Sequence, residues 1–308
     1  MPPAKATSVT HEHLLSVVNT EAARFSPGTL RVLDVGCGHG ELLAYLVSNL
    51  PLLRPSLQLE CYGFDVSDSG MMPVNFLRKV VDDLCQVDGT VDWAQRISLI
   101  RSTDPWPYGD DYFDVIVSNQ VIEHVDDHEL FFRELRRTLK DGGYSVHLVP
   151  LRECVWEPHI KLPLFHRLRN HDARTSYIGL MVRLRVKRPW LVHPAETVEA
   201  YSGREADIMR DFTNYVGQRD LYNLGKKVKL RTSFRYTRDF YYQKLRSLAH
   251  LPPRFLYRER RRYLFDFLSV LLLRYVAPVT LFLEKRRGIP HDAVVVDREA
   301  AKPATEVA

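Results

Sequence analysis

Between residues 30 and 150, short apolar runs alternate with segments of helical periodicity, and this order restricts the fold more than any other feature of the chain. Parallel strands need a crossover connection, which is usually a helix, so the alternation predicts an α/β fold with a mostly parallel sheet and helices on both faces. The expected strands cover residues 30–35, 57–65, 97–101, 114–118 and 144–149, and the expected helices between them cover residues 41–50, 72–85 and 127–139. A turn at Asp141-Gly142-Gly143 is expected to separate the last helix from the last of these strands.

The regular alternation ends at Pro150, and the remainder of the chain is irregular at first. Residues 1–150 are expected to form the core domain, and residues 151–225 a large insertion after the fifth strand that covers a substrate. Residues 226–287 are expected to return to the core with the last strands and an amphipathic helix. Within these segments we expect a helix over 195–215 and strands over 226–236 and 279–283. Residues 288–308 are expected to form a disordered tail.

A glycine-rich turn follows the first expected strand, in the sequence VLDVGCGHGELL at residues 32–43. Its alternating glycines, Gly36, Gly38 and Gly40, permit positive φ and let a ligand approach the backbone closely. In the dinucleotide-binding motif the third glycine comes one position later, where this chain has Glu41. A carboxylate there would repel a pyrophosphate, so the loop predicts a ligand without phosphates, and an amino-acid-like zwitterion fits.

Polar residues follow the next strands at the points where those strands end. Asp65 ends the second strand, Ser102-Thr103-Asp104 follows the third, and Asn119 follows the fourth. An acid in the position of Asp65 can accept hydrogen bonds from both hydroxyls of a ribose. Because ligands of open α/β sheets lie at the carboxyl ends of the strands, we expect these residues to surround one binding site.

Taken together, these segments resemble the class I S-adenosylmethionine-dependent methyltransferases, and most of all the small-molecule group with quinone-biosynthesis and natural-product enzymes. The resemblance covers residues 30–150 and the strand near 279–285. It implies a Rossmann-like sheet with a large insertion after the fifth strand, and S-adenosylmethionine as the cofactor. The segments that carry it are VLDVGCGHGELL, GFD at residues 63–65, YFDVIVSNQVIEHV at residues 112–125 and the Gly-Gly turn before the fifth strand.

The resemblance also implies which residues hold the cofactor. The glycine loop, the acid before it and Asn119 would line the methionine part, and Asp65 would hold the ribose. Thr103 or Asp104 would contact the adenine edge, although the family usually has an aspartate where this chain has Ser102. The expected cofactor-binding residues are Asp34, Gly36, Gly38, Asp65, Thr103, Asp104 and Asn119.

His124 and His159 are the expected catalytic residues. His124 follows the fourth strand, where the resemblance places the methyl group and the acceptor, and a histidine is suited to removing a proton at neutral pH. A role for His124 in ordering its own loop is left open. His147 and His166 are further candidates. Because Glu157, His159 and His166 lack the spacing of a metal-binding helix motif, no metal site is expected.

Charge is distributed unevenly along the chain. Residues 1–150 hold 12 Lys and Arg against 21 Asp and Glu, a net of −9, while residues 151–308 hold 31 against 17, a net of +14. The basic half suits an anionic or lipid-linked acceptor, a membrane surface, or neutralisation of the acidic half. A nucleic-acid acceptor is not expected. The residues after Ser118, Asn119 to Ile122, lack the Pro-Pro-aromatic motif of base amino-methylases, and the chain has no Pro-Cys nucleophile.

We therefore expect methyl transfer from S-adenosylmethionine to a small-molecule or lipid-like, anionic acceptor, at oxygen. A non-catalytic cofactor-binding protein on the same fold and an RNA-modifying methyltransferase are the alternatives. The polar start of the chain and its four scattered cysteines predict a cytoplasmic protein. The apolar segment 264–283 contains Asp266, Arg274 and Pro278, so it is not expected to span a membrane, although contact with a membrane surface stays open. The sequence does not give the oligomeric state.

Overall fold

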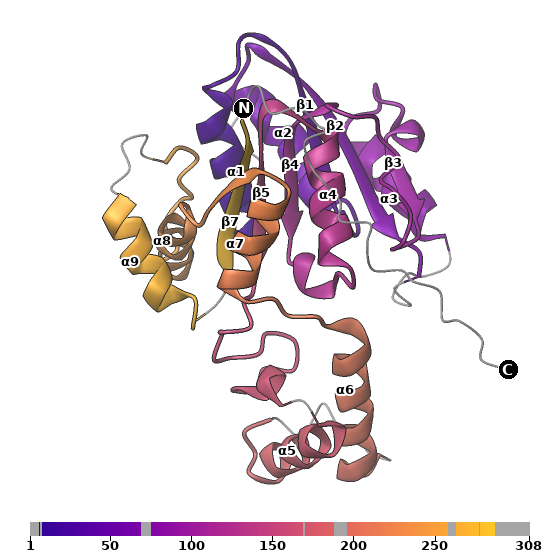
Figure 1. Ribbon diagram of the computed structural model, residues 1–308. Coiled ribbons are helices and arrows are strands. Elements are labelled where there is room, and N and C mark those ends of the chain that lie inside the picture. The colour runs from indigo at the N-terminus through magenta and orange to yellow at the C-terminus, as the bar shows by residue number, and fades with distance from the viewer. Residues whose placement is uncertain are drawn as a thin grey trace, which may run out of the picture.

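The computed structural model describes residues 6, 8–68, 75–168, 170–187, 196–257, 263–276 and 278–286. Within this part of the chain, a seven-stranded sheet forms the centre of the molecule, in the order β3-β2-β1-β4-β5-β7-β6 (Figure 1). The strands are β1 (Gly28–Val35), β2 (Leu57–Val66), β3 (Ile97–Ile100), β4 (Phe113–Asn119), β5 (Leu139–Val149), β6 (Leu230–Ser233) and β7 (Val279–Lys285).

Strands β1 to β5 are parallel, and β7 is antiparallel to both of its neighbours, β5 and β6. The chain moves outward from β1 through β2 to β3, and then returns to place β4 on the other side of β1. The loops after β1 and β4 therefore diverge, and such a switch point opens a crevice at the carboxyl ends of the strands. This arrangement confirms the expected α/β fold with a mostly parallel sheet.

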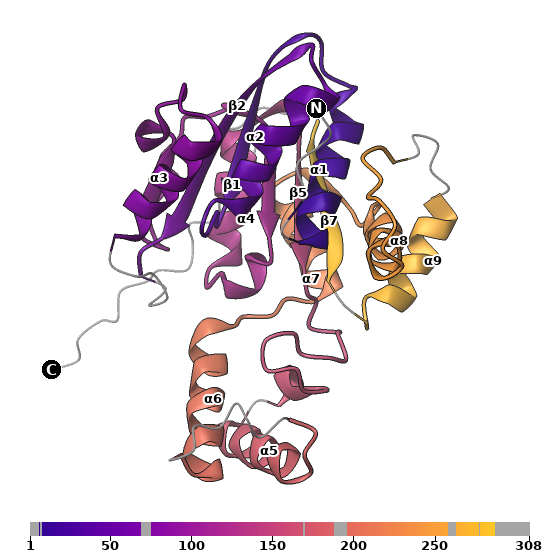
Figure 2. The same ribbon diagram turned by 180° about the vertical axis from the view of Figure 1, so that it is seen from behind.

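Helices cover both faces of the sheet (Figures 1 and 2). Figure 2 shows α1, α2 and α3 in front of the sheet, whereas Figure 1 shows α4 and α7 in front of the opposite face. Each face has its own buried apolar cluster, and successive residues of β4 contribute to both: Val115 and Val117 to the first, Ile116 to the second. The helices are α1 (Val9–Ala22), α2 (Glu41–Leu53), α3 (Phe76–Val87), α4 (His128–Thr138) and α7 (Gln218–Lys227).

The segment after β5 forms a small helical lobe at one end of the sheet (Figure 1). Its helices α5 (His171–Arg183) and α6 (Val198–Phe212) pack against each other around a separate cluster that includes Ile178 and Tyr201. Helix α6 corresponds to the helix expected over 195–215. After α6 the chain returns to the sheet, where the Asn214 amide donates a hydrogen bond of 2.6 Å to the Glu123 carbonyl.

Two expected boundaries are wrong. The turn expected at Asp141-Gly142-Gly143 belongs to β5, which begins at Leu139 directly after α4. A Cβ at Gly143 would lie 2.8 Å from the Asp114 carbonyl oxygen, so the missing side chain lets the strand start against β4. The strand expected over 226–236 is reduced to β6, because α7 continues to Lys227 and α8 begins at Thr237.

Two further helices, α8 (Thr237–Leu248) and α9 (Tyr263–Leu273), pack against each other beside β7 (Figure 1). Helix α9 buries Asp266 and Val270, while Leu264, Phe267 and Leu272 are 66%, 56% and 73% exposed. In the part of the chain that the structure describes, no helix is both long and apolar enough to cross a membrane. The tail expected to be disordered, residues 288–308, lies outside the described residues.

Candidate functional site

A cavity of about 400 Å³ opens at the carboxyl ends of β1, β2 and β4. Five of the residues expected at the site lie on its wall, whereas Asp34, Gly38, Thr103 and His159 do not. The wall also contains residues from the carboxyl end of α6, so the insertion closes one side of the cavity. The expected residues that line it are Gly36, Asp65, Asp104, Asn119 and His124.

The glycine loop after β1 has a backbone conformation that residues other than glycine rarely adopt. Gly36, Gly38 and Gly40 have φ of +66°, +49° and +76°. The Gly36 amide donates a hydrogen bond of 2.9 Å to the Phe64 carbonyl at the end of β2. A Cβ at Gly36 would lie 2.5 Å from Cγ2 of Val121, so the loop after β4 packs directly on this glycine. Glycine is therefore required at position 36 by both backbone conformation and space.

Asp65 ties the glycine loop to β2. Its carboxylate accepts a hydrogen bond of 2.8 Å from the Gly38 amide and another of 2.8 Å from the Val66 amide. Burial raises the pKa of Asp65, and these two hydrogen bonds offset part of the rise. Asp34 lies beneath the loop, only 2% exposed, where burial and the nearby Asp65 carboxylate raise its pKa well above the ordinary value.

The loop after β3 is ordered by an aspartate that the sequence interpretation missed. Asp68 accepts hydrogen bonds from the amide and the hydroxyl of Ser102, at 3.0 and 2.9 Å, and lines the cavity. Asp104 also lines the cavity, and its carboxylate accepts a hydrogen bond of 3.0 Å from the Arg101 amide. Asp68 comes three residues after Asp65 in a segment without regular periodicity, so no pattern identifies it.

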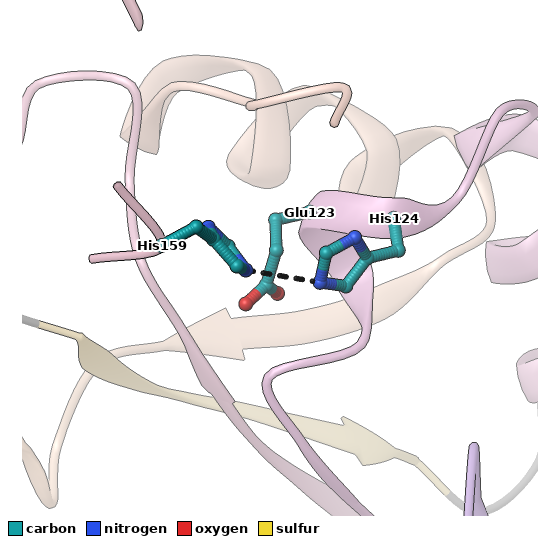
Figure 3. A group of neighbouring side chains, drawn as sticks. All are labelled: Glu123, His124 and His159. Atoms are coloured by element: carbon teal, nitrogen blue, oxygen red, sulfur yellow. Dashed lines mark hydrogen bonds between the residues drawn. The ribbon is translucent and has the colours of Figure 1, made fainter. Parts of the chain in front are cut away.

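Two histidines from distant segments meet beside the cavity (Figure 3). Nε2 of His124 and Nε2 of His159 are 3.3 Å apart. Nδ1 of His124 is 2.5 Å from the Phe212 carbonyl, and Nδ1 of His159 is 2.7 Å from Oε1 of Glu157. Burial, with His159 nearby, lowers the pKa of His124 although the carbonyl contact opposes the shift. The structure thus brings both expected catalytic histidines together.

Glu123 points into the same group (Figure 3). Its side chain is fully buried, and neither carboxylate oxygen has a hydrogen-bond partner among the described residues. Burial raises the pKa of Glu123 to about 8, and the nearby Glu157 charge acts in the same direction. The carboxylate of Glu123 and one ring nitrogen each from His124 and His159 lie within 4.8 Å of one another.

The other histidine and glutamate candidates have different roles. Nε2 of His166 is 2.9 Å from the Arg152 carbonyl. His147 is fully buried in β5, with Nδ1 2.7 Å from the Ser118 hydroxyl, and does not line the cavity. Glu157 is buried behind His159, where it also accepts hydrogen bonds from the Ile160 amide at 2.6 Å and from the hydroxyl of Tyr215. Although burial opposes it, these contacts lower the pKa of Glu157, so a carboxylate stands behind His159.

Comparison with known proteins agrees with this geometry. A family model described as a methyltransferase domain matches residues 10–215. A 2-methyl-6-phytyl-1,4-hydroquinone methyltransferase of Synechocystis is 29% identical over 51% of this chain and 45% of its own length. A ubiquinone biosynthesis O-methyltransferase of Bradyrhizobium diazoefficiens is 31% identical over 39% of each chain. An uncharacterized methyltransferase of Schizosaccharomyces pombe is 27% identical over 41% of this chain and 42% of its own length. The chain thus spans less than half the length of each relative.

Proposed function

The chain belongs to the methyltransferase domain family, and from this premise we propose that it transfers a methyl group from S-adenosylmethionine to a small or lipid-like acceptor, at oxygen. The observation that carries the proposal is the cavity at the switch point of the sheet, bounded by the Gly36 loop and Asp65. Two of the relatives, a hydroquinone methyltransferase and a ubiquinone biosynthesis O-methyltransferase, support an acceptor of this kind.

The residues around the cavity fit this cofactor. Oδ1 of Asn119 is buried without a hydrogen-bond partner among the described residues, beside the glycine loop, and could accept from an ammonium group. Asp65 is placed to accept hydrogen bonds from ribose hydroxyls. When bound, the sulfonium supplies an electrophilic methyl group, and the protein must hold the acceptor in line with it and exclude water.

The electrostatics of the cavity favour a positively charged cofactor and an uncharged acceptor. Among the residues that the structure describes, its wall contains six aspartates and neither lysine nor arginine. Such a wall attracts S-adenosylmethionine, whose sulfonium and ammonium groups outweigh its carboxylate, and repels an acceptor with a net negative charge. We therefore retain the small or lipid-like acceptor and no longer favour an anionic one, and the same repulsion argues against RNA. The six aspartates are Asp65, Asp68, Asp104, Asp126, Asp127 and Asp211.

We assign proton removal from an acceptor hydroxyl to His124 and His159, which lie away from Asp65 at the other end of the cavity. His124 lines the wall directly, and His159 reaches it through the contact between the two Nε2 atoms. The carboxyl end of α6 closes the cavity over this pair, because Phe212 both lines the wall and accepts from Nδ1 of His124. Water exclusion and general-base groups are therefore provided by the same contact between the insertion and the core.

We expect S-adenosylmethionine to bind one site per chain, and Asp65→Asn to weaken this binding about 10- to 100-fold. The substitution removes the charge and one acceptor for ribose hydroxyls, and hydrogen bonds to charged groups contribute roughly 1.5–3 kcal/mol each. Isothermal titration calorimetry with S-adenosylmethionine and S-adenosylhomocysteine measures the change.

Asp211→Asn is the matched control for this experiment, since it removes the same charge from the same cavity wall. Its carboxylate is exposed and paired with Arg210, so its effect on affinity should stay within about threefold. An equal loss in both variants would contradict the assignment of Asp65. Transfer of labelled methyl groups from the cofactor into a quinone or lipid extract then separates an enzyme from a protein that only holds the cofactor.

We also propose that the α8–α9 surface contacts a lipid membrane. Its apolar side chains include Leu245, Leu248, Leu268 and others that are between 46% and 76% exposed. Arg246 lies on α8 among them, and in the sequence the segment 258–262, which precedes α9, contains four arginines. An apolar helix face beside basic residues is typical of binding at an anionic membrane surface. The Val155 amide donates a hydrogen bond of 2.8 Å to the carbonyl of Tyr275, which follows α9, so this bond joins the insertion to the α8–α9 surface.

The chain is therefore expected to sediment with vesicles of phosphatidylglycerol and phosphatidylcholine, and less so as salt is raised. Leu268→Glu with Leu272→Glu should reduce the bound fraction at least fivefold, because charges replace apolar contact. Leu52→Glu is the control, since Leu52 is 49% exposed on α2, away from this surface. Equal sedimentation of all three proteins would contradict the proposal.

A further inference from the structure

The hydrogen bonds of His124 and His159 fix which ring nitrogen carries a proton. A backbone carbonyl only accepts, so Nδ1 of His124 must donate to Phe212. The carboxylate of Glu157 accepts likewise from Nδ1 of His159. In the neutral form of each ring the Nε2 atom then has a lone pair, and the two lone pairs face each other across 3.3 Å. The contact is favourable only with a positive charge there, which is either a cation bound between the two nitrogens or a proton that makes one ring an imidazolium.

Outer partners of this kind are characteristic of metal-binding histidines. Such a histidine usually donates its second ring N–H to a carboxylate or a backbone carbonyl, which fixes the tautomer and the orientation of the ring. His159 has the carboxylate of Glu157, and His124 has the carbonyl of Phe212. Tyr215 and the Ile160 amide in turn hold Glu157 in place.

The separation of the two nitrogens suits one shared ion. Zinc–nitrogen bonds are about 2.0–2.1 Å long, so two nitrogens on a tetrahedral ion are about 3.3–3.4 Å apart. The observed distance between the Nε2 atoms is 3.3 Å. A direct N–H···N hydrogen bond would require one of the rings to be a cation and would leave Glu123 without a partner.

Glu123 provides the third ligand. It adjoins His124 in a short 3₁₀ turn after β4, and its carboxylate is fully buried with no hydrogen-bond partner in the described part of the chain. An unpaired buried carboxylate is costly, whereas a buried carboxylate that coordinates a cation is not. Its ligand atom lies within 4.8 Å of the histidine nitrogens (Figure 3).

We propose that Glu123, His124 and His159 bind a divalent transition-metal ion at the end of the cavity. Two imidazoles and a carboxylate suit Zn²⁺ and its first-row neighbours rather than Mg²⁺, which prefers oxygen ligands. This differs from the sequence interpretation, which expected no metal site.

With both Nε2 atoms bound to the ion, the histidines would no longer accept a proton, and the ion would replace them in activating the acceptor, a step that rests on the proposed function. Three protein ligands leave a coordination position open, and His124 lies on the cavity wall. A hydroxyl oxygen bound there has a lowered pKa, so its proton leaves more readily to solvent or to a nearby carboxylate. The oxygen then keeps its electron pair, forms the bond to the methyl carbon, and the carbon–sulfur bond breaks toward sulfur.

The test is titration of the chelator-treated, full-length chain with ZnCl₂ in the absence of cofactor, followed by calorimetry. We expect one Zn²⁺ per chain and a weakening of at least tenfold in both Glu123→Gln and His159→Gln. His166→Gln is the matched control, because this histidine lies in the same insertion but contacts the Arg152 carbonyl instead, and its affinity should stay within twofold. Mg²⁺ should not compete at equal concentration.

X-ray absorption at the zinc edge of the wild-type chain keeps the test independent of whether the variants fold. We expect nitrogen and oxygen neighbours with the outer-shell scattering of two imidazoles. No stoichiometric binding, a spectrum without imidazole, or unchanged affinity in Glu123→Gln would overturn the proposal. Zinc binding without S-adenosylmethionine binding would leave the metal site standing and remove the proposed function, and the reverse result would remove only the metal site.

Discussion

Gly36→Ala is expected to weaken S-adenosylmethionine binding by more than 100-fold. Gly36 has φ of +66°, and an alanine held in that left-handed conformation costs about 1–2 kcal/mol. Its Cβ would also lie 2.5 Å from Val121, and overpacking of this kind costs about 1–3 kcal/mol more. At the middle of their ranges the two costs together exceed about 2.7 kcal/mol, and that free energy corresponds to a 100-fold loss of affinity for the cofactor. The loop must then move away from Asp65 and out of its binding geometry.

A second substitution separates the two costs. Val121→Ala removes both methyl groups that Gly36→Ala would contact, so the double variant should recover roughly 10-fold or more of the affinity. Titration calorimetry on the four proteins gives the coupling between the positions. Thermal melting shows whether each variant is folded. If Gly36→Ala binds the cofactor as tightly as the wild type, the loop does not form the cofactor site.

The parts of the fold that could be predicted are those in which local pattern and global structure agree. The strands around Val32, Cys61 and Val117 are buried and apolar, and each is followed by a helix with its own periodicity. Asp65 could be assigned because it ends a strand beside a glycine loop, a position with a physical role in many parallel sheets. These features depend on residues close together in the sequence.

The parts that could not be predicted depend on contacts between distant segments. His124 and His159 are 35 residues apart, and only the return of α6 to the sheet orients His124 through Phe212. Nothing in the sequence near Glu123 indicates that its carboxylate is buried without a partner. The outward face of α9 was equally hidden, because the spacing of its leucines is the same whether the helix faces the core or solvent.

The charge asymmetry of the chain has a partly structural origin. Lys227 pairs with Glu129 at 2.6 Å, and Arg235 pairs with Glu21 at 2.7 Å, so residues of the basic half neutralise acids of the core. Lys285, 3% exposed, is paired with Asp111 in the same way. The neutralising role that the sequence left open is therefore present.

Acid is expected to destabilise the protein through His147, by about 3 kcal/mol between pH 7 and pH 4. This histidine is fully buried, and burial lowers its pKa from 6.5 to about 3. The unfolded chain therefore binds a proton below pH 6.5 that the folded chain does not bind until about pH 3. Stability is fully present above pH 6.5 and is lost as pH falls through this window, at about 1.4 kcal/mol per pH unit.

The measurement is the free energy of unfolding in urea at pH 7, 5 and 4, for the wild type and for His147→Asn. Asparagine can still accept from the Ser118 hydroxyl, which is 2.7 Å from Nδ1 of His147, but it does not titrate. Other groups, including the buried Asp34, titrate alike in both proteins and cancel in the difference. The variant should be less stable at pH 7, because it leaves space in the core, and should lose about 3 kcal/mol less on going to pH 4. A difference between the two proteins that does not change with pH would show that His147 is protonated as readily in the folded chain as in the unfolded one.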